Sequence, residues 1–361
     1  MVQTDIAARN MLPCPHVQWL DLDGIFPAWS LVDPNKLKRI VDFFEHPEAQ
    51  YPSVVFFIGK RSKTDALKGL YANNNTTRWK SHGIANLHVD LDTIRSTYPT
   101  IFADCTVNAA CTGHLGTWDT CHASHHYVVG EDDESNSMRL KDIVSHIHVN
   151  LLFPFTHVVC LFASDFGGNK ACVSYVENWL RIEGSTPDTK IHGVPCLVIA
   201  TTDPGDIGSL VQLECHTKFN LVFGSLTIVK VEVSARAADP GNLFLQAELR
   251  RIMDEARNDR LQGDLLLSAK HLAQTFPRAI RAFANCPHKA INIFSCSDHP
   301  AAHVPSVADH LKAFLSAGIG LGAPARAVSE FIASAFLVQG YPSYAHREDE
   351  QYRNWTTTDG M

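Results

Sequence analysis

The sequence SVVFFIGKRSKT, residues 53–64, decides the fold class of this chain. Residues 53–58 are dense in β-branched and aromatic side chains, which is typical of a strand buried on both faces of a sheet. Gly59 ends this run, and residues 62–71 have the character of a helix. A buried strand followed directly by a helix predicts one β–α unit of an α/β sheet.

The same alternation of strand-like and helix-like segments continues along the chain. Further strand-like runs lie at residues 85–91, 100–105, 156–163, 194–201 and 225–234. Helix-like segments separate several of these runs, the clearest at residues 137–152 and 172–182. Strands that alternate with helices predict a mainly parallel sheet with helices on both faces, which is a three-layer α/β fold. Residues 53–58 are expected to form its central strand.

The chain of 361 residues is long enough for more than one domain. Residues 1–50 are expected to form an N-terminal extension with one helix at residues 34–48, which starts at a proline and stops near another. Residues 51–236 then form the α/β domain. The strand signal fades after residue 240, so residues 237–361 are predicted to be a helical C-terminal appendage with a frayed polar tail.

The composition is that of an ordinary globular protein, with 45% apolar and 19% charged residues. The formal net charge of −7 does not favour a nucleic-acid-binding protein, because such proteins are usually basic. No run of 18 apolar residues is present, so no membrane span is expected. The N-terminus shows no signal-peptide pattern, and several of the ten cysteines lie in apolar runs, which predicts a reducing, cytoplasmic location.

The turn after the central strand is the first candidate for a functional site, because ligands bind beyond the carboxyl ends of parallel strands. Gly59, Lys63 and Thr64 follow the order of residue types in the phosphate-binding loop GxxxxGK[ST]. In that loop the glycines let N–H groups surround phosphate, the lysine reaches it and the hydroxyl holds Mg²⁺. Here the loop is shorter, and Ser62 replaces the second glycine. An ordinary strand-to-helix turn with solvated basic residues is the alternative.

Polar residues also follow three other predicted strands. Asp104 ends the run at 100–105, where an aspartate can hold Mg²⁺ directly or through water, or can simply cap a turn. Asp203 follows the run at 194–201, at the position of an aspartate that reads guanine in GTPases. Ser234 follows the last run, where a Ser-Ala pair often supports the base. The common order of these residues along alternating strands favours a nucleotide site.

The motifs resemble the P-loop, GTPase-like domain of a large fungal family whose members often carry it beside patatin-like phospholipase or NLR-type modules. The phrases that carry the resemblance are VVFFIGKRSKT, TIFADCTV, FTHVVCLFAS and LVIATTD, together with DHPAAHVPSVADHLKAFLSAG and SEFIASAFLVQGYPSYAHR in the tail. The likeness covers roughly residues 50–346. It implies a sheet of P-loop NTPase type with GTP or ATP and Mg²⁺ as ligands. No Gly-x-Ser-x-Gly elbow is present, so no lipase activity is implied.

The resemblance also implies a role for each matching residue. Lys63 corresponds to the phosphate lysine, Thr64 to the Mg²⁺ hydroxyl and Asp104 to the Walker B-like aspartate. Ser81 corresponds to the switch hydroxyl, and Asp203 corresponds to the base-reading residue. The altered glycine pattern opposes catalysis and tight nucleotide binding.

A second candidate site lies in the Cys/His-rich segment at residues 105–126. Cys111 and His114 are separated by two residues, and Cys121 and His125 by three, which are spacings compatible with a tetrahedral Zn²⁺ site. A metal clip would order a loop that has little core of its own. A metal-free, switch-like loop and a Cys121–His125 nucleophile pair are the alternatives.

The sequence therefore predicts a degenerate P-loop NTPase-like module with a regulatory or assembly role and a protein partner. Losing two charge-assisted phosphate bonds of about 1.5–3 kcal/mol each would weaken nucleotide binding by about 10² to 10⁴. The alternatives are an active GTPase or ATPase with a shortened phosphate loop, and a zinc-stabilised protein-interaction module.

Overall fold

The computed structural model divides the chain into two compact units, Met1–Cys296 and Ser297–Met361. The described parts of the first unit are residues 17–25, 28–74, 84–107, 124–130, 139–182, 193–202, 207–236, 238–263 and 265–296. In the second unit the structure describes residues 315, 316, 324, 326 and 330. Arg326 and Glu330 there form an exposed ion pair of 2.8 Å at helical spacing.

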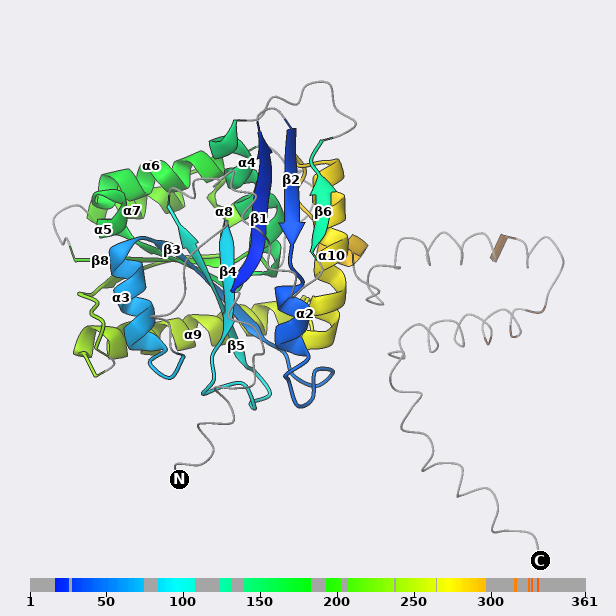
Figure 1. The fold of residues 1–361 in the computed structure, drawn as a ribbon, viewed down its shortest axis with the longest axis horizontal. Helices are drawn as coiled ribbons and strands as arrows, with labels where there is room; N and C mark the ends of the chain where they lie inside the picture. The colour runs from blue at the N-terminus through cyan, green and yellow to red at the C-terminus, as the bar shows by residue number, and fades with distance from the viewer. Residues whose placement is uncertain are drawn as a thin grey trace, which may run out of the picture. The chain divides into compact units, whose positions relative to one another are not determined.

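A nine-stranded sheet organises the first unit (Figure 1). Its strands in spatial order are β6 (His125–Val128), β2 (Ala28–Asp33), β1 (Gln18–Ile25), β4 (Ala85–Val89), β5 (Thr100–Thr106), β3 (Ser53–Gly59), β7 (Val158–Phe162), β8 (Cys196–Thr201) and β9 (Leu226–Lys230). The five strands from β5 to β9 in this order are parallel. The other four pairings, including that of β4 with β5, are antiparallel. The α/β class is confirmed, whereas a mainly parallel sheet is wrong.

Short connections explain two of the four antiparallel pairings. A parallel return needs a crossover of about a dozen residues or more. Only residues 90–99 join β4 to β5, and two residues join β1 to β2. Both pairs therefore fold back antiparallel, whereas the longer segments around β7 and β8 leave room for helices. A continuous apolar run indicates that a strand is buried on both faces. It does not indicate whether the neighbouring strands are parallel or antiparallel.

The N-terminal region contributes more than the single predicted helix. That helix is present in shorter form as α2 (Lys36–Val41). The strands β1 and β2 precede it and extend the sheet beyond β4. In β1, Leu20 and Leu22 are buried while Asp21 and Asp23 are partly exposed, as the two-residue period of a strand requires. Residues 1–50 are therefore not only an extension with one helix, because two of their strands are part of the sheet.

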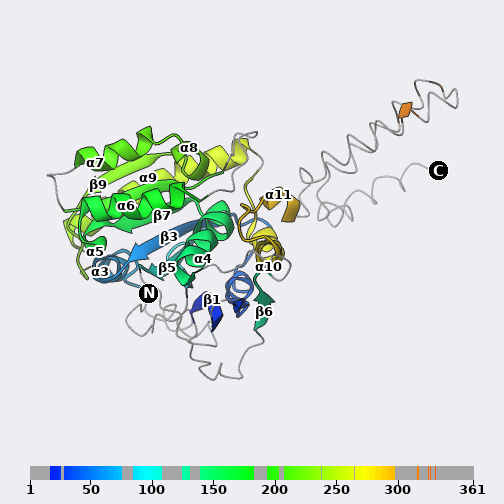
Figure 2. The ribbon, with the colours of Figure 1, turned by 90° about the horizontal axis from the view of Figure 1, so that it is seen from above.

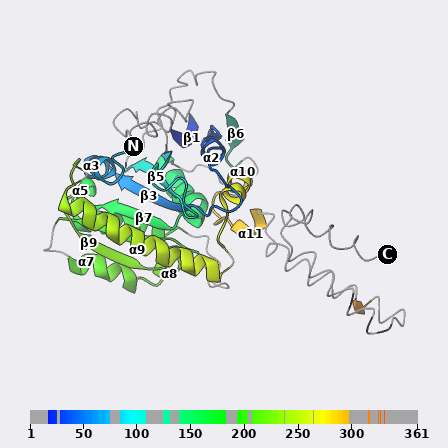
Figure 3. The same ribbon diagram turned by 90° about the horizontal axis from the view of Figure 1, so that it is seen from below.

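Helices cover both faces of the sheet. One face carries α3 (Arg61–Leu70) and α9 (Pro240–Gln262), and Figure 3 shows α9 crossing the strands. The longer helices on the other face, visible in Figure 2, are α4 (Leu140–His146), a π-helix at Ile147–Leu152, α6 (Asn169–Leu180) and α10 (Ala269–Asn285). The short helices are α5 (Ala163–Phe166), α7 (Ile207–Val211), α8 (Phe219–Val222) and α11 (Ile293–Cys296), with 3-10 turns at Phe153–Phe155 and Gln212–Cys215.

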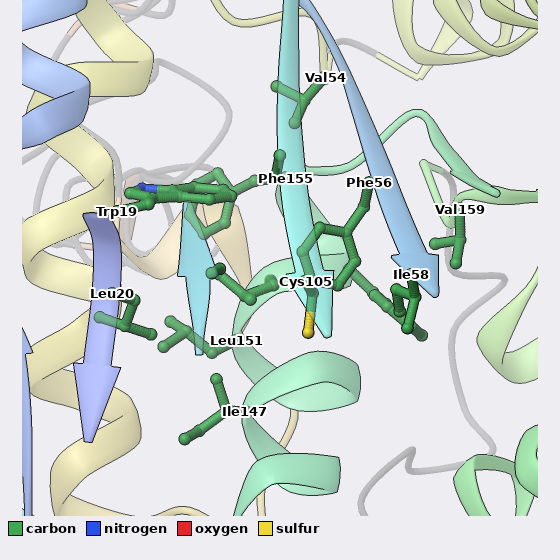
Figure 4. Packing of buried hydrophobic residues seen from close by; sticks show 14 of the residues in the cluster. Trp19, Leu20, Val54, Phe56, Ile58, Cys105, Ile147, Leu151, Phe155 and Val159 are labelled. Atoms are coloured by element: carbon green, nitrogen blue, oxygen red, sulfur yellow. The ribbon is translucent and has the colours of Figure 1, made fainter. Parts of the chain in front are cut away.

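Strand β3 divides its side chains between two hydrophobic cores. Val54, Phe56 and Ile58 lie in the larger core, which Figure 4 shows from close by. Val55 and Phe57 lie in the smaller core under α3 and α9. All five side chains are buried, and each contributes about 1.5–3 kcal/mol by leaving water. This double burial explains why the sequence of β3 is continuously apolar.

The helices α9, α10 and α11, which lie between residues 240 and 296, belong to the first unit. Up to residue 296 they are therefore not a separate appendage. Leu245, Leu249 and Ile252 of α9 are buried in the smaller core. On the other face, Phe276 of α10 stacks on Trp19 of β1 with ring centroids 4.9 Å apart. Within the described part of the chain, none of the helices combines the length and apolar character needed to cross a membrane.

Candidate functional site

Strand β3 lies where the path of the chain through the sheet reverses. From β3 the chain passes through β4 to β5 on one side, and it later reaches β7 on the other side. Ligand crevices in α/β sheets form at the carboxyl ends of strands at such a switch point. Gly59 is the last residue of β3 and Arg61 the first of α3, so the turn between them occupies this position.

Three backbone N–H groups, one in this turn and two in the first turn of α3, converge on one carboxylate. Asp165 of α5 accepts hydrogen bonds from the N–H of Lys60 at 2.6 Å, of Ser62 at 2.9 Å and of Lys63 at 2.9 Å. The Oγ atoms of Ser62 and Ser164 are 2.9 Å apart beside it. These three N–H groups form a nest, which is a concave set of backbone donors that favours an anion at the start of a helix. Here the anion is a carboxylate of the protein itself.

Gly59 is required by the close approach of this carboxylate. A Cβ atom at position 59 would lie 2.5 Å from Oδ2 of Asp165 and 2.8 Å from Cβ of Lys63. Both distances are shorter than any normal contact between such atoms. The role of Gly59 is therefore to leave space for the Asp165 carboxylate. The sequence suggests Gly59 as the first glycine of a phosphate loop.

The side chain of Lys63 points toward β5. Its ammonium forms an ion pair with Asp104 and donates a 2.9 Å hydrogen bond to the carbonyl of Cys105. The side chain of Lys63 is 3% exposed and that of Asp104 is 12% exposed. The structure thus brings these two predicted residues together, as a directly paired lysine and aspartate.

Thr64 is turned away from the nest. Its hydroxyl donates a 2.7 Å hydrogen bond to the carbonyl of Lys60, four residues earlier in the chain. Threonine often makes this bond to its own helix, and it uses the hydroxyl hydrogen there. The predicted Mg²⁺ hydroxyl is exposed but is not directed at the position of the anion.

Ser234 is engaged elsewhere. Its backbone carbonyl accepts a 2.7 Å hydrogen bond from Asn242 of α9, and its Oγ accepts one from the N–H of Arg236 at 3.2 Å. The Asn242 side chain packs against Gly69, near the far end of α3. Ser234 therefore fixes the chain before α9, and no contact joins it to the nest.

Two predicted nucleotide ligands, Ser81 and Asp203, lie outside the described residues. The strand that precedes Asp203 ends at Thr201, whose hydroxyl donates a 2.8 Å hydrogen bond to Oδ1 of Asn169 at the start of α6. Both side chains are buried. This bond ties the end of β8 to the helix that follows Asp165.

Most of the predicted zinc site, namely Cys111, His114 and Cys121, also lies outside the described residues. His125 is the first residue of β6, where it is exposed and pairs in register with Asp33 of β2. Among the residues that the structure describes, no three potential ligands gather closely enough to hold a metal ion.

Cys105 begins the Cys/His-rich segment but is a core residue. Its Sγ lies 3.6 Å from Nε2 of His148, and both side chains are buried. Burial raises the pKa of the Cys105 thiol to about 12, against a smaller opposing effect of Lys63. A thiol with so high a pKa stays protonated and unreactive at neutral pH.

Sequence reasoning does not single out Asp165. Its contacts with the nest span more than a hundred residues, as between Lys60 and Asp165. A usable signal is nevertheless present, because Asp165 follows the strand β7, which pairs directly with β3 on the side opposite to β5. An acidic residue at that strand end can reach a turn at the end of β3.

The residues at this edge do not fit a magnesium-bound nucleotide. The N–H groups that would surround a phosphate already hold Asp165. The ammonium of Lys63 is paired with Asp104, and the hydroxyl of Thr64 is turned to the carbonyl of Lys60. The arrangement can hold a helix start and a strand end together, but it presents no open phosphate cradle.

Searches with protein-family models and among curated proteins found no match to this chain.

Proposed function

We propose that this chain is a degenerate P-loop NTPase-like module that acts in regulation or assembly without tight nucleotide binding or hydrolysis. The buried Lys63–Asp104 ion pair carries the proposal. To reach a phosphate, Lys63 would have to leave Asp104 buried without its counter-charge. Breaking such a pair costs about 3–5 kcal/mol, which corresponds to a loss of affinity of about 10² to 10⁴.

The position of these residues supports descent from a phosphate-binding fold. Gly59, Lys63 and Asp104 lie at the switch point of the sheet, on the elements that the resemblance to the fungal GTPase-like family implies. Each of them now has a partner inside the protein. The sheet is retained, but the positions that would bind phosphate are occupied by side chains of the protein. Such a fold suits a role in binding other proteins better than a role in nucleotide hydrolysis.

Nucleotide titration tests the proposal. We expect wild-type protein to show no micromolar binding of GTP or ATP by calorimetry, with or without Mg²⁺, and no hydrolysis above background. Lys63→Ala should leave this result unchanged, and the double variant Lys63→Met/Asp104→Leu removes the pair without leaving a lone charge. Lys60→Ala, in the exposed part of the turn, controls for non-specific attraction of phosphates. Micromolar binding that Lys63→Ala abolishes would instead establish an active GTPase or ATPase.

Metal analysis separates the zinc-stabilised module from this proposal. Stoichiometric Zn²⁺ in purified protein, lost in Cys111→Ser/Cys121→Ser, would support an interaction module built on the segment at 105–126. Zinc at far below one equivalent in the wild type would remove that alternative.

A further inference from the structure

The carboxylate of Asp165 occupies the position that a phosphate would take in a nucleotide-binding loop. Two N–H groups, of Lys60 and Lys63, bond to its Oδ2, and that of Ser62 bonds to its Oδ1. All three lie at the carboxyl end of β3, one just before α3 and two in the first turn of α3. Only glycine fits at position 59 beside it. The nest is therefore fully formed, and its occupant is covalently part of the chain.

We propose that Asp165 is a built-in anion that closes the nest, as an autoinhibitory contact between the β7–α5 turn and the start of α3. The proposal rests on the proposed function, because it takes the turn after β3 to be a former phosphate loop. A free oxyanion must displace Asp165 to bind. A tethered group acts at an effective concentration of about millimolar or more, so it excludes weak external anions.

Asp165 lies in the short helix α5, between two buried residues and just before two glycines. Ala163 and Asn169 are both buried, and Asn169 is also held by Thr201. Between them, Gly167 has φ 101° and Gly168 has φ 111°, and a Cβ at either position would meet nothing within 4 Å. Two successive glycines in this region have backbone freedom that other residues lack. A change of side-chain rotamer at Asp165, together with a backbone change at these glycines, can withdraw the carboxylate from the nest while β7 and α6 stay in place.

The charges around the nest define what would replace Asp165. Lys60 and Arg61 are exposed at the turn, and the start of α3 adds its partial positive charge. Lys63 remains bound to Asp104 and contributes no new donor. The opened nest thus suits a single tetrahedral oxyanion, such as phosphate or sulfate. Among the described residues, it offers no second set of ligands for Mg²⁺ or a triphosphate.

Substitution of Asp165 tests this contact, with inorganic phosphate and sulfate as probes at constant ionic strength. We expect Asp165→Ala to bind phosphate at least about tenfold more tightly than wild-type protein. The amide NMR signals of Lys60, Ser62 and Lys63 should shift on phosphate addition in the variant only. Asp165→Asn keeps the size of the side chain without its charge and should show a smaller gain, and it serves if Asp165→Ala does not fold.

Two matched controls sharpen the test. Asp65→Ala makes the same change of charge on α3, where Asp65 contacts Arg61 and Lys68 instead of the nest. Ser164→Ala removes the hydroxyl contact with Ser62 but keeps the carboxylate. Both controls should bind phosphate as weakly as the wild type. Equal gains in Asp65→Ala and Asp165→Ala would reduce the effect to net charge and overturn the proposal.

The outcome distinguishes this proposal from the proposed function. A folded Asp165→Ala or Asp165→Asn protein with no gain in phosphate affinity overturns the autoinhibitory contact and leaves the degenerate module intact. Micromolar nucleotide binding by the wild type overturns the degenerate module itself. Phosphate binding by the wild type that equals binding by Asp165→Ala shows that Asp165 does not close the nest.

Discussion

At the residue scale, the Lys63–Asp104 pair links the candidate site to the stability of the fold. Lys63→Met leaves the buried Asp104 carboxylate without its partner, so the free energy of unfolding should fall by about 3–5 kcal/mol. Replacing both groups with apolar side chains of similar size is often neutral. Lys63→Met/Asp104→Leu should therefore recover most of the loss. Urea unfolding monitored by circular dichroism measures both changes.

The double variant decides what the pair does. Recovery of stability would assign the cost of Lys63→Met to the unpaired carboxylate. If Lys63→Met were as stable as the wild type, the ion pair would not be formed in solution, and the main support for the proposed function would be lost.

Buried histidines make the fold sensitive to mild acid. Burial lowers the pKa of His148 to about 3. Burial, with nearby cationic side chains, holds the pKa of His88 and His157 well below the usual value. In the unfolded chain, histidines take up protons near pH 6.5, whereas these three histidines stay neutral at that pH in the folded protein. The free energy of unfolding therefore falls as the pH drops below that value. From pH 6 to pH 5 the unfolding free energy should fall by about 3–4 kcal/mol.

Single variants test the contribution of each histidine to this loss. His148→Phe suits the aromatic surroundings of Phe56, Phe153 and Trp179, and should reduce the fall between pH 6 and pH 5 by about a third. The exposed His126 is the control, and His126→Ala should leave the slope unchanged. A slope that is the same in all three proteins would contradict the assignment.

Two buried carboxyls act in the opposite direction. Burial raises the pKa of the Asp33 and Asp90 carboxyls, so these groups take up protons more readily in the folded state than in the unfolded chain as the pH falls. That uptake opposes the effect of the histidines.

At the element scale, α9 is tied to two loops by one arginine. Nη2 of Arg260 donates to the carbonyls of Pro154 at 3.0 Å, Thr156 at 2.6 Å and Gly193 at 2.7 Å. The residue is buried, and burial lowers its pKa to about 10. Arg260→Met should lower the unfolding free energy by about 3 kcal/mol or more, because hydrogen bonds from charged groups contribute about 1.5–3 kcal/mol each.

An arginine on the same helix provides the comparison. Arg251 is 48% exposed and pairs with Glu248 and Glu255 on the surface. Arg251→Met should change the unfolding free energy by no more than about 1 kcal/mol. Equal effects of the two substitutions in chemical unfolding would show that the loops before β7 and β8 do not depend on Arg260.

The strands whose limits the sequence predicts most closely are those buried on both faces. β3, β5, β7 and β8 have continuous apolar runs, and their predicted limits agree with the structure to within a few residues. Strand β6, with the sequence HHYV, has largely exposed side chains and no such run, so the sequence does not reveal it. Direction and pairing depend on connections and partners far away in the chain. The contact of Asp165 with the turn after β3 is missed for the same reason, and only the position of Asp165 directly after β7 points to it.

At the scale of the whole molecule, the first unit contains both of its hydrophobic cores. Every described residue of the two cores lies before Ser297. A chain that ends at residue 300 should therefore fold, with a midpoint of thermal unfolding within a few degrees of that of the full chain. Calorimetry of the two proteins checks this. A truncated protein without a cooperative transition would show that the second unit is required for folding.

The position of β3 in the sheet has a consequence for synthesis on the ribosome. β3 is made early, but its partner strand β7 ends at Phe162, about 100 residues after β3. At about 5–20 residues per second, that interval lasts about 5–20 s. Throughout it, one edge of an apolar strand has no partner strand. Nascent chains arrested before β7 should therefore bind chaperones through residues 53–58, and chains released after α9 should not.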